Sequence, residues 1–67
     1  MMKVTIHDEE RAVAEGTTLA SLLRELGVQS ENVAVAVNHA VVPRQGFEQH
    51  ALAEGDAIEI IRAVAGG

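Results

Sequence analysis

The sequence predicts an α+β fold, a mixed sheet with one main helix packed across one face. Three observations predict it: alternating apolar residues at the start of the chain, four leucines at helical spacing in residues 19–26, and a long β-prone run in residues 57–64. The resulting order is strand, strand, helix, strand, strand, irregular segment, strand. Because this order is not an alternating βαβ pattern, the helix is expected to cover one face of the sheet.

The first two strands are expected to form a hairpin. Met2, Val4 and Ile6 alternate with polar residues, which is typical of a strand with one buried face. Residues 7–10, His-Asp-Glu-Glu, are then expected to form a polar turn, and residues 11–14 to return as the second strand.

The helix is the clearest element. Its leucines recur at i, i+3, i+4 and i+7 and therefore share one stripe: Leu19, Leu22, Leu23 and Leu26. Thr17 or Thr18 can act as the N-cap, and Gly27 suits the left-handed position after the last turn. Both ends of the helix are therefore marked in the sequence.

The second half of the chain predicts three more strands. Residues 33–37 alternate Val with Ala, Asn38-His39 is a turn, and Val41-Val42 is a short strand stopped by a proline. The secondary structure of residues 44–53 is ambiguous, with a turn of helix expected near Phe47. The side chain of Phe47 is expected either to fill the core or to border a partner interface. The run at 57–64 is the longest strand and is expected to be central, which completes a β-grasp.

Strand alternation assigns residues to the two faces of this sheet. The inward set is Met2, Val4, Ile6, Val13, Val33, Val35, Val37, Ile58 and Ile60. The outward set includes Thr5, Ala34, Ala36, Glu59, Ile61 and Ala63. Ile61 is the one large aliphatic residue in the outward set, so this face is either a docking site or a surface with scattered apolar residues.

Composition restricts the function further. The 67 residues are expected to form one domain, 1–67, too small for a buried multi-step active site. The net charge of -5 and the lack of a basic cluster argue against nucleic acid and favour steering onto a basic protein surface. No membrane span or signal peptide is visible, so a cytoplasmic protein is expected. The absence of cysteine excludes a disulfide, a thiolate metal site and a persulfide on the chain's own thiol.

Two sets of polar residues are candidate sites. Residues 7–10 offer carboxylates and an imidazole as metal ligands, and His39 and His50 are possible acid–base groups. Hard cations require convergent ligands, and no nucleophile or orienting partner accompanies the histidines. We interpret all of them as solvated loop residues, and expect no catalytic and no metal-binding residue.

Three motifs lie in the order typical of one known family. They are Val35-Ala36-Val37-Asn38-His39-Ala40-Val41-Val42-Pro43-Arg44, Glu54-Gly55-Asp56-Ala57-Ile58-Glu59-Ile60 and Ala63-Val64-Ala65-Gly66-Gly67. Together with the leucine-rich helix, they make the chain resemble the sulfur carrier proteins of thiamine biosynthesis over nearly its whole length. That family has the ubiquitin-like β-grasp fold and is related to the small subunit of molybdopterin synthase.

The resemblance implies a protein cosubstrate and not an enzyme. The carboxylate of Gly67 would be adenylated by a ubiquitin-activating-like enzyme that uses ATP and Mg²⁺, giving a glycyl adenylate. A sulfur donor, such as a cysteine desulfurase or a rhodanese-type protein, would convert it to a thiocarboxylate, 1-thioglycine. Thiazole synthase would then take the sulfur, and the chain itself would bind no cofactor.

The tail, residues 65–67, is expected to be flexible and to deliver this carboxylate. Glycine lacks Cβ, so Gly66 gives access to a narrow cleft, and Ala65 stands where related tails often have a third glycine. The expected partner-docking residues lie beside the tail and on the outward face: Ile61, Ala63, Val64, Ala34 and Ala36.

Two alternatives remain open at this point. The same fold and tail would serve a carrier that supplies another pathway, such as molybdopterin, cysteine or thiolated-nucleoside synthesis. A ubiquitin-like protein-binding module with a non-functional tail is an alternative of another class.

Overall fold

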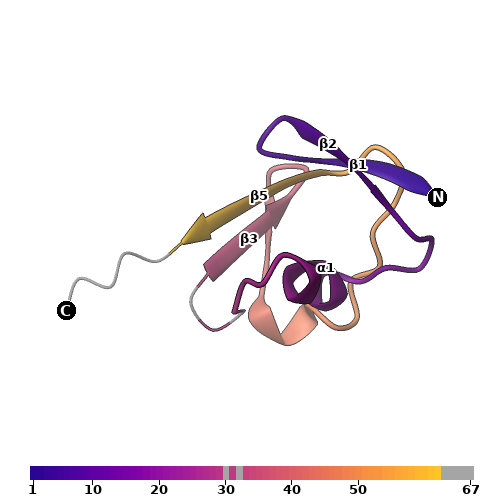
Figure 1. Cartoon of the computed structure of the whole chain (residues 1–67). Helices are drawn as coiled ribbons and strands as arrows, with labels where there is room; N and C mark the ends of the chain where they lie inside the picture. The colour runs from indigo at the N-terminus through magenta and orange to yellow at the C-terminus, as the bar shows by residue number, and fades with distance from the viewer. Residues whose placement is uncertain (30, 32, 63–67) are drawn as a thin grey trace.

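The computed structural model describes residues 1–29, 31 and 33–62. Its chain order begins with a hairpin, continues through the main helix, and ends in the strand that leads toward the C-terminus (Figure 1). The elements are β1 (Met2–Ile6), β2 (Glu9–Val13), α1 (Leu19–Glu25), β3 (Val33–Val37), β4 (Ala40–Val42), the 3-10 helix η2 (Arg44–Gly46) and β5 (Ala57–Arg62).

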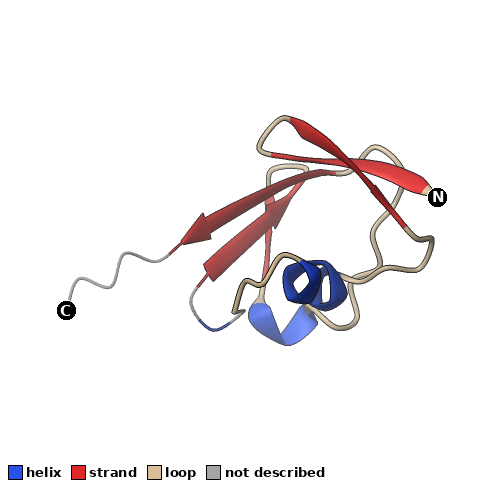
Figure 2. Ribbon diagram, viewed as in Figure 1, coloured by secondary structure: helices blue, strands red, loops and turns tan. Residues whose placement is uncertain are grey.

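The strands form one mixed sheet in the order β2-β1-β5-β3-β4. β5 runs parallel to β1 and antiparallel to β3, and the other neighbouring pairs are antiparallel. The helix lies across one side of this sheet, beside η2 (Figure 2). The predicted β-grasp and the central position of the last strand are therefore confirmed.

Both hairpins turn on two residues with positive φ angles. His7 and Asp8 have φ of 52° and 70°, and Asn38 and His39 have φ of 53° and 70°. Such two-residue turns match the right-handed twist of the flanking strands. The second turn was predicted correctly. The first was predicted to be too long, because Glu9 and Glu10 already belong to β2 and pair with β1.

The ends of α1 follow from its capping residues. Thr18, and not Thr17, is the N-cap, and its hydroxyl accepts from the backbone N–H of Ser21 at 3.2 Å. Gly27 has φ of 73°, a left-handed angle that favours glycine at the end of a helix. Thr17 is used differently, since its hydroxyl donates to the carbonyl of Ala14 at 2.6 Å.

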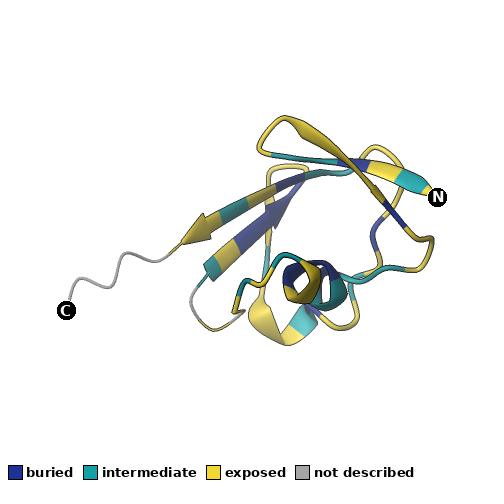
Figure 3. Cartoon of the chain, viewed as in Figure 1, coloured by how far each residue is buried: buried dark blue, intermediate teal, exposed yellow. Residues whose placement is uncertain are grey.

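The core lies between the helix and one face of the sheet (Figure 3). All nine residues predicted to point inward are either buried or packed against this core. Phe47 and Leu52, from the connection between β4 and β5, complete it with 2% and 4% of their surface exposed. Phe47 is therefore a core residue, and the alternative of a place at a partner interface is wrong.

Candidate functional site

The predicted reacting end lies outside the described residues. This applies to Ala63, Val64, Ala65, Gly66 and Gly67, and to the last two residues of the predicted final strand. The structure does describe β5, which ends at Arg62 and carries this segment. The site is therefore built from β5 and its surroundings.

The start of β5 is held by two of the sequence motifs acting together. The side-chain amide of Asn38 donates to Asp56 Oδ1 at 3.0 Å, and its oxygen accepts from the backbone N–H of Ala57 at 3.0 Å. Asp56 Oδ2 in turn accepts from the N–H of Ala53 at 2.8 Å. The asparagine of one motif and the aspartate of another thus connect the β3–β4 turn to the first residue of β5.

The two neighbours of β5 support it over different lengths. β3 pairs with it from Ile58 to Arg62, along the whole second part of the strand. The register with β1 covers only Ala57 and Ile58. The end of β5 nearest the tail is therefore paired with another strand on one side only, the side of β3.

The sheet face opposite the helix carries an apolar patch, which we call the outer patch: Ile61, Ala34 and Val41. Ile61 is 57% exposed and lies directly opposite Ala34, which is also exposed. Val41 is 71% exposed and lies opposite Ala36 on the edge strand β4. The patch thus has members on the three neighbouring strands β5, β3 and β4, and Ile61 lies one residue before the last described residue of β5.

Two corrections to the sequence-based docking set follow. Ala36 does belong to the outer face, but only 6% of its surface is exposed, because its short side chain lies between the longer Val41 and Glu59 in the register. It forms the floor of the outer patch and offers almost no contact surface. Val41 was not in the predicted docking set. The two-residue turn at Asn38-His39 places Val41 opposite Ala36, so the turn indicates that Val41 lies on the outer face.

The other candidate residues are spread over the surface. His39 is exposed, with Nδ1 3.9 Å from Glu59 Oε1, and the backbone carbonyl of His50 accepts from the N–H of Leu19 at 3.0 Å. Within residues 1–29, 31 and 33–62, no three His, Cys, Asp or Glu side chains are arranged to hold a metal ion. No α-helix in the same part of the chain is long and apolar enough to cross a membrane.

The sequence profile of the ThiS family matches residues 2–67. Among curated proteins, the sulfur carrier protein ThiS of Escherichia coli is 33% identical over 66 residues, which are 98% of this chain and 100% of that protein. A crystal structure of the thiamine biosynthesis protein ThiS from Geobacter metallireducens superimposes with a TM-score of 0.85 at 33% identity. It covers 98% of this chain and 100% of that one.

A second kind of relative is much longer. A protein named thiazole synthase from Paramagnetospirillum magneticum is 42% identical over 66 residues, which are 98% of this chain but 20% of that protein. The chain thus spans about a fifth of the length of this relative.

The profile match, the carrier matched over its whole length and the shared fold agree, and the chain therefore belongs to the ThiS family of sulfur carrier proteins.

Proposed function

We propose that the chain carries sulfur for thiazole formation in thiamine biosynthesis, as a thiocarboxylate on Gly67. The observation that carries the proposal is the family match, which extends through residue 67 and so includes Gly66-Gly67. It is supported by the relatives named sulfur carrier protein, which are matched over 100% and 98% of their own lengths.

The proposed chemistry begins with activation, because a carboxylate delocalises its charge and resists attack by sulfur. The Gly67 carboxylate attacks the α-phosphate of ATP, pyrophosphate leaves, and a glycyl adenylate forms on a partner enzyme that holds Mg²⁺. A sulfide equivalent from a donor protein then forms a C–S bond as the C–O bond to AMP breaks. The net change in the chain is one oxygen replaced by sulfur, so the chain is a cosubstrate.

The outer patch is the proposed docking surface for the adenylating enzyme and for thiazole synthase. Exposed aliphatic groups on a soluble domain mark interaction sites when they are contiguous, and Ile61 and Ala34 face each other across β5 and β3. Ile61 is also one residue before Arg62, the last described residue of β5. A partner bound at this patch would therefore lie next to the segment that it must receive.

Thiazole synthase is the acceptor that the comparisons favour. Two relatives named thiazole synthase, from Paramagnetospirillum magneticum and Magnetococcus marinus, contain a segment 42% and 41% identical to this chain. A covalent link between a carrier-like segment and such an enzyme is economical when the two work together. Acceptors of the molybdopterin, cysteine or thiolated-nucleoside pathways have no corresponding support.

Intact-mass analysis tests the proposal. Incubation with ATP, Mg²⁺, an adenylating enzyme and a sulfur donor should give a species about 16 Da heavier, since sulfur replaces oxygen. The unmodified mass alone, with the partner enzymes shown to be active on another carrier, would reject the thiocarboxylate.

Deleting Gly66-Gly67 separates a carrier from a binding module. The deletion removes nothing that the described core uses, so thermal unfolding should be unchanged, whereas sulfur transfer should be lost completely. Full function of the shortened chain would instead support a binding module that does not use its tail.

A further inference from the structure

β5 lies between β1 and β3, and its pairing with β1 stops before β5 ends. The N–H groups of Thr5 and His7 donate to the carbonyls of Asp56 and Ile58, at 2.9 and 3.2 Å. His7 then adopts a φ of 52° and the chain turns away into β2. In a regular parallel ladder, the next bonds on this edge would involve the backbone of Ile60. The described part of β1 supplies no backbone group there.

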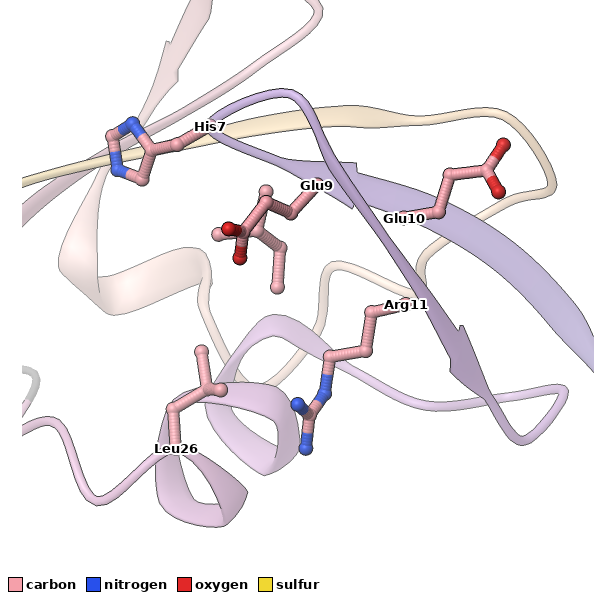
Figure 4. A pocket seen from close by; sticks show the side chains of 6 residues that line it. His7, Glu9, Glu10, Arg11 and Leu26 are labelled. Atoms are coloured by element: carbon pink, nitrogen blue, oxygen red, sulfur yellow. The ribbon is translucent and has the colours of Figure 1, made fainter.

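The side chain of His7 takes that place. Its Nε2 lies 3.1 Å from the backbone nitrogen of Ile60 and 3.0 Å from the backbone oxygen of the same residue. A ring with a lone pair on Nε2 accepts from the N–H, and a ring with a proton on Nε2 donates to the carbonyl. Figure 4 shows the imidazole ring of His7 lying across the ribbon of β5.

We infer that His7 is a positioning residue for the tail: its imidazole replaces the backbone of β1 as the last partner of β5. The bond is made at Ile60, two residues before the end of β5 at Arg62. Without it, the last three residues of β5 are paired only with Val33–Val35 of β3. The imidazole thereby restrains the described end of β5, up to Arg62, after which the tail follows in the sequence.

This anchoring has a kinetic consequence, which rests on the function proposed above. An enzyme that captures the tail must immobilise the chain that carries it, and a looser strand end loses more conformational freedom on binding. The complex, once formed, is the same with or without the anchor. Removal of the bond should therefore raise the KM for the carrier in the adenylation reaction and leave kcat unchanged.

Two substitutions separate the hydrogen bond from the shape of the side chain. His7→Phe keeps a planar ring but has neither acceptor nor donor, whereas His7→Gln keeps both in one amide. Neither residue is favoured at positive φ, so the backbone strain in the two variants is similar. His39→Gln is the matched control, because His39 also lies in a hairpin turn with positive φ but only approaches Glu59.

Hydrogen exchange tests the anchor without any partner enzyme. We expect His7→Phe to lower the protection of the Ile60 amide by roughly 2- to 10-fold, the equivalent of one net hydrogen bond, and His7→Gln to restore it. His39→Gln should leave it unchanged. Equal protection of this amide in the wild type and in His7→Phe would overturn the inference.

Adenylation kinetics test the consequence for delivery. We expect a rise in KM of roughly 2- to 10-fold for His7→Phe, with kcat unchanged and with recovery in His7→Gln. A change in kcat alone, or no change at all, would overturn the positioning role. If the wild-type chain is not adenylated, the proposed function fails, whereas the exchange measurements still decide the anchor.

Discussion

At the scale of single residues, two isoleucines of β5 illustrate how position determines role. Ile58 has 1% of its surface exposed and lies in the core, while Ile61, three residues later, is 57% exposed on the outer patch. Because side chains alternate along a strand, an odd separation places the two on opposite faces. The same residue type therefore serves stability at one position and is available for binding at the other.

Alanine substitutions should separate these roles. Ile58→Ala leaves a cavity in a closely packed core and should lower the free energy of unfolding by about 2–5 kcal/mol. Ile61→Ala should change it by less than about 0.5 kcal/mol, as is usual for surface positions. Urea denaturation of both variants checks the values. A loss of several kcal/mol for Ile61→Ala would show that its side chain packs within the fold and is not free to bind.

The same variant tests docking. Ile61→Ala should weaken binding to the adenylating enzyme by about 1–2 kcal/mol if the side chain fills a partner pocket, which titration calorimetry can measure. Thr5→Ala, on the same face but away from the outer patch, is the control and should bind normally. Unchanged affinity for Ile61→Ala would place the docking surface elsewhere.

Alternation accounts for what could be predicted at this scale and for what could not. All nine residues that it placed inward are confirmed, and so is the exposure of Ile61, because the longer strands show a clear period of two. It missed Val41, because β4 has three residues and its face depends on the turn that precedes it. The burial of Ala36 depends on the length of its neighbours' side chains. Assigning a residue to one face of the sheet does not show how far its neighbours cover it.

At the scale of elements, the helix depends on its first turn. The hydroxyl of Thr18 accepts from the N–H of Ser21, one of the groups that a helix start leaves without an internal partner. Thr18→Ala should therefore lower the free energy of unfolding by about 1 kcal/mol, and Thr18→Ser, which keeps the oxygen, should recover most of it. Thermal unfolding measures both. Equal stability of the two variants would mean that the hydroxyl does not act as a cap.

The Asn38–Asp56 connection predicts coupling between two turns. Asn38→Ala removes two side-chain hydrogen bonds at the start of β5 and should cost roughly 1–3 kcal/mol. Asp56→Ala removes its bond to Asn38 and the one to Ala53. In the double variant the two losses should not add, with a coupling of about 0.5 kcal/mol or more. Simple additivity in denaturation would contradict a direct interaction.

This connection also shows a limit of reading elements from sequence. Both turns were identified by composition, and the helix caps by the residues beside the leucine stripe, because these signals are local. The pairing of Asn38 with Asp56 joins residues 18 positions apart and depends on β3 and β5 being neighbours. His7 and Ile60 are 53 positions apart, so their contact was equally hidden. Local patterns predict the elements, and the sheet order then decides which loops meet.

At the scale of the whole molecule, composition and element order were sufficient for the fold. A single amphipathic helix can cover only one face of a sheet, so one face is expected to be covered and the other open, and the core indeed lies on the helix side. The open face carries the outer patch, and the chain as a whole carries a net charge of -5. The two features act differently in binding, since apolar contact holds a complex and net charge accelerates its formation.

The charge leads to a prediction about association with the adenylating enzyme. If the carrier is steered onto a basic surface, its association rate constant should fall by roughly 10-fold or more between about 0.05 and 0.5 M salt, because screening shortens the range of the attraction. The dissociation rate should change much less. Stopped-flow measurements with a fluorophore on the enzyme resolve the two rates.

Two neutralising substitutions locate the relevant charge. Glu59 lies on β5 and is exposed on the outer face, two residues before Ile61. Glu59→Gln should therefore lower the association rate at low salt and flatten its salt dependence. Glu15→Gln removes the same charge from an exposed position in the β2–α1 connection and should have a smaller effect. Equal effects would mean that only the total charge matters, and an association rate independent of salt would exclude electrostatic steering, leaving the outer patch to account for both recognition and affinity.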